Sequence, residues 1–388
     1  MTSRSGRHFL QIPGPAPVPD PVLRALSAPT IDHRGPEFAE LSATLLKRLP
    51  ALFGTAQPVV VYPSSGTGAW EAALCNTLSP GDRVLCFETG HFASLWATMA
   101  ERLGLVVDMV PGDWRHGADP DVLRSTLSAD RSGSIRAVAV VHNETSTGVM
   151  SRMPEIRAAI DSAGHDALLL VDTVSSLGSV EVCHDAWGVD VTIAGSQKGM
   201  MLPPGLGFNA ISAKARAAAG RSPCTSSYWA WEPHLAANSN GFFPYTPATN
   251  LLYGLGAALD LLDAEGMPHV FARHARHAEA TRRAVRGWGL EILAADPREY
   301  SNTLTAVIVP DGVNADDVRA TILRRFDMSL GTGLGCLAGR VFRIGHLGST
   351  NDLTVVGALA GVQMGLRSSG VDVPGEGLDA AVGYLESC

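Results

Sequence analysis

The sequence has no long apolar run, no excess of positive charge and no closely spaced pair of cysteines. Its apolar runs, such as residues 168–171, have the length of a strand and fall well short of the roughly 18 residues of a membrane helix. The first residues carry basic side chains but no apolar core of signal-peptide length. Lys and Arg number 30 against 38 Asp and Glu. Because nucleic acid requires basic patches, neither nucleic acid nor a membrane is an expected partner.

The cysteine pattern excludes further classes. Six cysteines in 388 residues, with no Cys-x-x-Cys, form neither a disulfide framework nor a zinc site. We expect them to be thiols in a reducing cytoplasm. The sequence also lacks a Gly-x-Ser-x-Gly elbow, a P-loop and a dinucleotide-binding fingerprint. Their absence disfavours a serine hydrolase and the common nucleotide-binding folds.

Short apolar runs alternate with amphipathic stretches through residue 262 or so. This alternation predicts an α/β fold, in which a mostly parallel sheet carries helices on both faces. The runs are apolar throughout, as in strands that are buried on both sides. We expect a proline- and glycine-rich arm over residues 1–15 that lies on a surface, a large domain over 16–265 and a smaller α/β domain over 266–388. The expected strands are 83–88, 105–111, 135–142, 167–172, 190–195, 205–212, 303–310 and 339–348, and the expected helices are 68–78, 92–104, 120–129, 154–164, 250–264, 269–289 and 316–326.

One acid and one lysine stand out at successive strand ends. Asp172 closes the most apolar strand, where carboxylates are rare unless they have a partner. Lys198 follows the next strand, between small and polar neighbours in Gly-Ser-Gln-Lys-Gly. Ligands in open α/β sheets collect at the carboxyl ends of strands. The pair suits pyridoxal phosphate (PLP), with the lysine as Schiff-base amine and the acid on the pyridine nitrogen. Taken singly, Asp172 also suits a turn cap and Lys198 an ordinary surface residue.

A loop of small residues precedes both Asp172 and Lys198 in the sequence. Ser65, Gly66 and Thr67 follow the apolar run 59–63 and open a helix, whose free N–H groups favour a phosphate. An ordinary helix cap is the alternative, because short glycine loops are weak signals.

Other polar residues have either a structural or a ligand-binding interpretation. The segment 142–148 follows a strand, and we expect its polar side chains to line the same crevice. Arg343 lies in an apolar strand and either pairs with a buried acid or binds a ligand carboxylate. His269, His274 and His277 share a helix rich in Arg, so we expect a solvated face and no metal site. Aromatic residues expected to serve packing are Trp70, Trp96 and the run 228–231, the last near a subunit interface.

These segments together resemble the class V, fold-type I PLP-dependent aminotransferases, especially the alanine–, serine– and aspartate–glyoxylate group. The resemblance covers nearly the whole chain and rests on IPGP, TIDHRGPEF, SSGTGAWEAAL, HNETSTGV, VDTVSSLG, GSQKGMMLPPG, PYTP and FRIGHLG. Two positions depart from it: Phe92 stands where many relatives stack a tryptophan on the cofactor ring, and Phe243 stands where some have a tyrosine.

The resemblance implies a role for each matching residue. Lys198 and Asp172 are the catalytic pair. Substrate contacts fall to Gly14 in the arm and to Arg343, which binds the α-carboxylate; beyond the resemblance, we expect His33 to contact the side chain of the substrate. The other cofactor-binding residues are Ser65, Gly66, Thr67 and Gln197 at the phosphate, Phe92 and Val174 on the ring, Thr145 near the phenolic oxygen, and Tyr245 and Thr246 at the phosphate of a neighbouring subunit. The last two imply a homodimer with shared active sites.

The implied reaction transfers the amino group of a small L-amino acid to glyoxylate by a ping-pong cycle. Serine is the favoured donor, since His33 and Arg34 suit a polar side chain, and it yields hydroxypyruvate and glycine. Aspartate–glyoxylate and alanine–glyoxylate transamination are the alternatives. Two further interpretations stay open: a cysteine desulfurase-type lyase that uses Cys224 or Cys336, and a binding protein without catalysis on the same fold.

Overall fold

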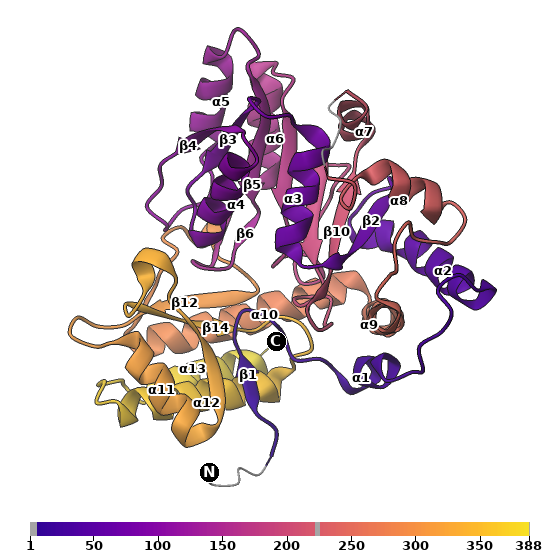
Figure 1. Cartoon of the computed structure of the whole chain (residues 1–388). Helices are drawn as coiled ribbons and strands as arrows, with labels where there is room; N and C mark the ends of the chain where they lie inside the picture. The colour runs from indigo at the N-terminus through magenta and orange to yellow at the C-terminus, as the bar shows by residue number, and fades with distance from the viewer. Residues whose placement is uncertain (1–5, 222–225, 388) are drawn as a thin grey trace.

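A seven-stranded sheet forms the centre of the larger part of the molecule (Figure 1). The computed structural model describes residues 6–221 and 226–387. In order across the sheet the strands are β2 (Val59–Ser64), β10 (Gly205–Ile211), β9 (Val191–Gly195), β8 (Leu168–Asp172), β5 (Ile135–Val141), β3 (Arg83–Phe87) and β4 (Val106–Val110). Only β10 runs antiparallel to its neighbours in this sheet. The prediction of a mostly parallel α/β sheet is therefore confirmed.

Helices cover both faces of this sheet. Alternate residues of one strand point to opposite cores: Val138 and Val140 of β5 pack on one side, and Ala137 and Ala139 on the other. This is why the strand sequences are apolar throughout. One face carries α3 (Gly66–Thr77), α4 (His91–Arg102), α7 (Ala213–Ala219) and α8 (Trp231–Asn238); the other carries α2 (Pro36–Leu52), α5 (Pro120–Ala129), α6 (Met153–Ala163) and α9 (Thr249–Glu265), with α1 (Asp20–Leu26) packed on α9.

A second sheet of five strands combines four strands from the carboxyl-terminal part of the chain with one from the N-terminal arm. Its order is β1 (Phe9–Gln11), β13 (Met328–Thr332), β14 (Val341–Gly345), β12 (Leu304–Ile308) and β11 (Glu291–Ile292). The helices of this part are α10 (Met267–Gly287), α11 (Ala315–Phe326), α12 (Asp352–Ser368) and α13 (Glu376–Glu386). Shorter elements are the β6 (Asn143–Glu144) and β7 (Val149–Met150) ladder and the 3-10 turns Pro297–Glu299 and Gly335–Leu337.

The N-terminal arm joins this second sheet. The sequence predicts an arm without regular structure, yet Phe9–Gln11 pairs in parallel with residues 328–330. In Figure 1 the indigo strand β1 accordingly lies among the orange and yellow elements. The arm then crosses back toward the large sheet, where the Ala16 N–H donates to the Gln197 oxygen at 2.8 Å. Both ends of the arm are therefore held by backbone hydrogen bonds.

The prediction for the histidine-bearing helix is wrong for two of its three histidines. His269 is exposed, but His274 and His277 of α10 are fully buried. Their rings contact the loop after β14: His274 Nε2 accepts from Gly348 N at 3.0 Å, and His277 Nδ1 lies 3.2 Å from Thr350 Oγ1. The helix face that the sequence predicted to be exposed to solvent therefore packs against this loop.

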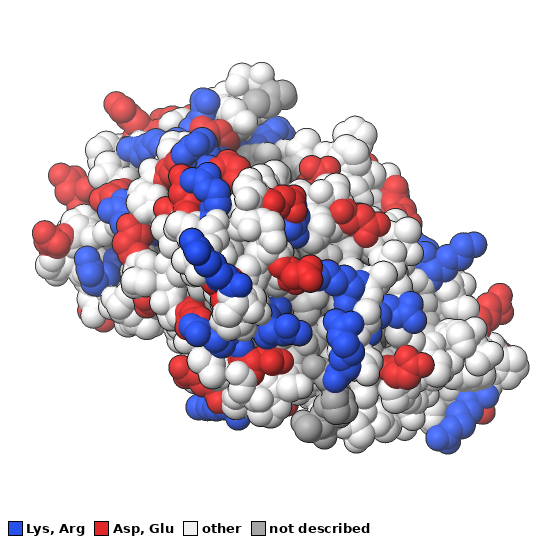
Figure 2. All heavy atoms as spheres, turned by 90° about the horizontal axis from the view of Figure 1, so that it is seen from above, with Lys and Arg blue, Asp and Glu red and all other residues white. Residues whose placement is uncertain are grey.

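The surface carries charges of both signs. Figure 2 shows Lys and Arg interspersed with Asp and Glu over the face seen from above, with white side chains between them. Within residues 6–221 and 226–387, no helix is long and apolar enough to cross a membrane.

Candidate active site

A pocket of about 220 Å³ opens where the strands of the large sheet end. Asp172 ends β8, Lys198 lies in the loop between β9 and β10, and the N-terminus of α3 follows β2. The topology thus brings together the three features that the sequence singled out. The lining residues are Gly14, Pro15, Gly66, Thr67, Trp70, Phe92, Thr145, Asp172, Val174, Gln197, Lys198 and Pro204.

The loop that carries Lys198 is closed on itself by Ser196. The Ser196 hydroxyl donates to the Pro203 oxygen at 2.8 Å and accepts from Leu206 N at 3.1 Å. Lys198 is buried, and its Nζ donates to the Pro13 backbone oxygen and stands 3.5 Å from Thr145 Oγ1. These contacts fix the position of the lysine side chain between the arm and the loops at the strand ends.

The arm lies directly over the lysine. Gly14 has φ +100°, which favours glycine, and a Cβ added there would come within 2.3 Å of Lys198 Cδ. Glycine is therefore required at this position both by the backbone and by the close approach. The sequence predicted an arm contact here, and the structure places Gly14 in the pocket.

The two central groups both titrate near neutrality. Burial, and then the positive charge of Arg343, lower the pKa of Lys198 to about 7. Burial raises the pKa of Asp172 to about 7, against the hydrogen bonds that its carboxylate accepts. The lysine amine is consequently neutral in an appreciable fraction of molecules at neutral pH, as a nucleophile must be.

The phosphate end is defined by the start of α3. Ser65, in an extended conformation, precedes the helix, and its side chain makes no capping hydrogen bond. The first N–H groups of the helix are thus left for an anion. A Cβ on Gly66 would lie 2.5 Å from Val174 Cγ2, so the backbone approaches the pocket only because this residue is glycine. Gly66 and Thr67 line the pocket, whereas Ser65, which precedes them in the chain, is not among its lining residues.

Gln197 supplies a second polar group at this end. Its side-chain Oε1 is buried and has no hydrogen-bond partner in the described part of the chain. Because an amide can exchange its oxygen and nitrogen by a flip, the same position can present an N–H donor to a phosphate oxygen. The donor set therefore fits a phosphorylated aldehyde cofactor: helix N–H groups and an amide at one end, and a lysine and an acid at the other.

Glu144 fixes the element that carries Phe92. Its fully buried carboxylate accepts from Ala93 N at 3.0 Å and from Phe92 N at 3.4 Å, and also from the N–H and hydroxyl of Ser146. An anion at the N-terminus of a helix is stabilised by the free N–H groups and the helix dipole. Glu144 thus anchors the first turn of α4, from which Phe92 reaches the pocket.

The prediction for segment 142–148 holds for one side chain. Thr145 lines the pocket, whereas His142 and Asn143 turn into the protein. The His142 ring lies 2.9 Å from Ser176 Oγ, and Asn143 Nδ2 donates to Ser175 Oγ and Thr303 Oγ1, both at 2.8 Å. These two polar side chains join the loops beneath the pocket and do not face it.

Arg343 reaches the site from the second sheet. From β14, its Nε donates to the Thr332 oxygen at 2.8 Å and its Nη1 to the Thr145 oxygen at 2.6 Å. Burial lowers the pKa of Arg343 to about 10, so it stays cationic at neutral pH. Within residues 6–221 and 226–387, Nη2 has no hydrogen bond to protein. One edge of the guanidinium is thereby left for a carboxylate.

Arg343 borders the pocket through Thr145 but is not among its lining residues, and three other predicted residues lie away from it within one chain. Tyr245 and Thr246 are exposed, and the Tyr245 hydroxyl donates to the Ser227 oxygen at 2.8 Å. His33 is half-buried, and its Nε2 has no hydrogen-bond partner among the described residues. Of the cysteines considered for a lyase, Cys336 is exposed in a 3-10 turn and Cys224 lies outside the described residues.

Trp70 is a site residue that the sequence analysis assigned to packing. It lines the pocket, and its indole N–H donates to Asp172 Oδ2 at 3.0 Å. Its position in the first turns of the helix predicted to bind phosphate was the available signal, because one face of that helix was expected to point toward the cofactor.

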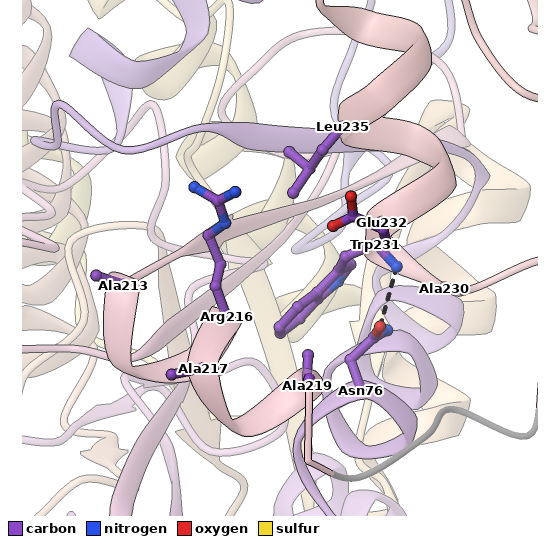
Figure 3. A pocket seen from close by; sticks show the side chains of 10 residues that line it. Asn76, Ala213, Arg216, Ala217, Ala219, Ala230, Trp231, Glu232 and Leu235 are labelled. Carbon is purple, nitrogen blue, oxygen red and sulfur yellow. Dashed lines mark hydrogen bonds between the residues drawn. The ribbon is translucent and has the colours of Figure 1, made fainter.

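A larger hollow, of about 600 Å³, lies between α3, α7 and α8 (Figure 3). Its lining includes four alanines, Trp231 and Leu235, and its charged side chains are Arg216 and Glu232. Asn76 Oδ1 accepts from Trp231 N there at 2.9 Å, which closes one wall. Among the described residues that line the hollow there is no lysine, serine, threonine or cysteine, whereas the smaller pocket contains both Lys198 and Asp172.

The fold and the smaller pocket define the class: a fold-type I enzyme that depends on pyridoxal phosphate. The family model for class V aminotransferases matches residues 9–351. The chain therefore belongs to the class V aminotransferase family and is a PLP-dependent transaminase, as its sequence predicted. In the described parts of the chain, no group of three or more His, Cys, Asp or Glu is arranged to hold a metal ion.

Individual proteins of this family are similar to the chain over nearly its whole length. The chain is 47% identical to a serine–glyoxylate aminotransferase of Methylorubrum extorquens, over 99% of this chain and 97% of the relative. It is 42% identical to an L-aspartate–glyoxylate aminotransferase of Paracoccus denitrificans, over 95% of this chain and 94% of the relative. The crystal structure of ureidoglycine–glyoxylate aminotransferase from Bacillus subtilis superposes with a TM-score of 0.91 at 28% identity and covers all of both chains.

Proposed function

We propose that this enzyme transfers the amino group of L-serine to glyoxylate, giving hydroxypyruvate and glycine. The observation that carries the proposal is the similarity to serine–glyoxylate aminotransferases over nearly the full length, with 47% identity to one of them. The pocket agrees with small substrates, since its volume of about 220 Å³ has to hold the cofactor as well. Aspartate is the second candidate donor, on the strength of the 42% identical aspartate–glyoxylate relative.

The proposed division of labour follows the geometry. Lys198 binds the cofactor aldehyde, and its Nζ, with a pKa near 7, accepts the proton from the α-carbon of the donor and releases it again. Asp172 accepts a hydrogen bond from the ring nitrogen. When bound, the cofactor supplies an electron-withdrawing ring that stabilises negative charge at the reacting carbon.

The remaining roles concern binding. The start of α3 with Ser65, Gly66 and Thr67, together with Gln197, binds the phosphate. Phe92 and Val174 enclose the ring, and Thr145 lies close to its oxygen substituent. Arg343 binds the α-carboxylate that donor and acceptor share, so one cation serves both half-reactions.

We further propose a homodimer in the cytoplasm. Tyr245, Thr246 and His33 lie outside the pocket of their own chain, and the first two are exposed, so they are available to the site of a second copy. In that arrangement Tyr245 and Thr246 complete the phosphate site, and His33 with Arg34 meets the donor side chain. The proposed domains are 16–265 and 266–388, with the arm 1–15. The first carries the seven-stranded sheet and the β6–β7 ladder, and the second carries the five-stranded sheet apart from the arm strand β1.

The visible spectrum of the purified protein tests the function. L-Serine, L-aspartate and L-alanine are added separately, and glyoxylate follows. We expect serine to convert the absorption of the lysine-bound cofactor to that of its amine form, and glyoxylate to restore it. If only aspartate converted the cofactor to its amine form, aspartate would replace serine as the proposed donor. Sulfide release from cysteine without amine-form accumulation would favour a lyase, and no cofactor band after addition of PLP would remove the proposal.

A further inference from the structure

Both oxygens of the Asp172 carboxylate are held by N–H donors. The Val174 backbone N–H donates to Oδ1 at 2.6 Å, and the Trp70 indole donates to Oδ2 at 3.0 Å. The two donors reach opposite ends of the carboxylate, so they fix its rotation. Asp172 and Trp70 are both buried, with 4% and 3% of their surface exposed, which keeps water from substituting for either donor.

The Trp70 ring is itself held in place by its neighbours. It stacks on Trp96 with 5.8 Å between ring centroids and 16° between planes, and it meets Phe92 edge-on at 6.5 Å. Trp96 is equally buried, yet its Nε1 has no hydrogen-bond partner in the described part of the chain. Of two stacked indoles, only Trp70 uses its N–H group. The pair therefore provides an experiment with a built-in control.

Helix α3 connects this contact to the other end of the pocket. Gly66 and Thr67 form its first turn at the proposed phosphate site, and Trp70 follows about one turn later on the same side. A single rigid helix thus presents its N-terminus to the phosphate and an indole N–H to the acid. The distance between the two anchoring points for the cofactor is set within one element.

We propose that Trp70 is a positioning residue that keeps Asp172 ionised and aimed at the ring nitrogen of the cofactor. The inference rests on the proposed role of Asp172 and adds to it the group that maintains that role. An ionised carboxylate accepts on both oxygens, whereas a protonated one must donate with one of them. Two N–H donors therefore favour the ionised form, which is also the stronger acceptor for a protonated ring nitrogen.

Burial opposes this effect. It raises the pKa of Asp172 to about 7, while the hydrogen bonds from Val174 and Trp70 lower it. At this balance, the loss of one donor changes the protonation of Asp172 in the neutral pH range. A purely structural tryptophan would not affect that protonation.

The test compares the dissociation constants of PLP for the wild type, Trp70→Phe and Trp96→Phe. We expect Trp70→Phe to weaken binding roughly tenfold, as for loss of a hydrogen bond to a charged group, and Trp96→Phe to change it less than about twofold. The same substitutions are repeated in an Asp172→Asn background, where Trp70→Phe should then have an effect below about twofold. Equal effects of the two substitutions, or an undiminished effect of Trp70→Phe in the Asp172→Asn background, would overturn the proposal.

A second variant tests the proposal if Trp70→Phe folds poorly. Site-specific incorporation of 3-benzothienylalanine at position 70 retains the bicyclic shape and replaces only the N–H with sulfur. Its PLP-bound spectrum, titrated with pH, should show the ring nitrogen losing its proton at lower pH than in the wild type. An unshifted titration would reject the proposal. A wild type that binds no PLP would instead refute the proposed function, so the two failures are distinct.

Discussion

Arg343 Nη1 donates to the backbone oxygen of Thr145 at 2.6 Å, and this bond crosses from the second sheet to a loop of the first. The Thr145 hydroxyl lies 3.5 Å from Lys198 Nζ. The proposed carboxylate-binding group and the proposed catalytic amine are therefore both positioned against the same residue. A displacement of the second sheet changes substrate binding and proton transfer together.

Lys198→Ala removes the amine that binds the cofactor and carries the proton. We expect the transamination rate to fall by at least about 10³-fold, because both roles are lost together. Lys214→Ala is the matched control, since Lys214 lies 3.9 Å from the exposed Asp166 and away from the pocket. Steady-state assays with serine and glyoxylate measure both. A Lys198→Ala protein with near-normal turnover would be incompatible with the assigned roles.

Arg343→Lys retains a positive charge but loses the planar fork. We expect KM to rise about tenfold or more for donor and acceptor alike, with a smaller change in kcat, because both substrates present a carboxylate to the same group. The exposed Arg340, three residues earlier, provides Arg340→Lys as control. A change confined to one of the two substrates would show that Arg343 does not serve both half-reactions.

The pKa of Lys198 predicts how cofactor uptake depends on pH. Its folded-state pKa of about 7 lies below the ordinary 10.5, so the neutral amine becomes the major form as pH rises through 7. Between pH 6 and pH 8 the neutral fraction rises about tenfold, and the rate at which PLP-free protein binds PLP should follow it. Stopped-flow absorbance measures this rate. A rate that begins to rise only near the ordinary pKa of lysine would contradict the burial effect.

Buried histidines predict a loss of stability in acid. Burial lowers the pKa of His142 and His184 to about 4 and that of His274 to about 3, while the unfolded chain keeps values near 6.5. Between these values the unfolded state binds more protons, so stability is lost as pH falls below about 6.5. Each such histidine contributes up to about 1.4 kcal/mol per pH unit.

Denaturant unfolding between pH 7 and pH 5 checks this expectation. His184→Asn should lose stability at neutral pH, because it breaks the 2.8 Å contact with Thr192 Oγ1, and should show a shallower dependence on pH. Parallel curves for the wild type and His184→Asn would show that His184 does not titrate between the two states.

The sequence predicted the large sheet, and its chemistry, because the signals there are local. Strands buried on both faces are continuously apolar, and Asp172 and Lys198 stand out at the ends of such runs. Trp70 and Glu144 were missed because their roles depend on hydrogen bonds to residues distant in the chain, Asp172 and the start of α4. The strand Phe9–Gln11 was missed because three residues are too few to show a periodic pattern. The burial of His274 and His277 was missed because a polar ring in the sequence gives no sign of the loop that packs against it.

The pairing of β1 with β13 has a consequence for biosynthesis. His8 Nδ1 lies 3.0 Å from Asp327 Oδ1, although 319 positions separate the two residues. At roughly 5–20 residues per second, a ribosome needs on the order of 15–60 s to make the stretch between them. Throughout that interval the start of the arm has no β13 to pair with, so only contacts such as Ala16 N–H to the Gln197 oxygen can hold the arm near Lys198. The strands of the large sheet and Lys198 are thus synthesised well before the strand that pairs with the start of the arm.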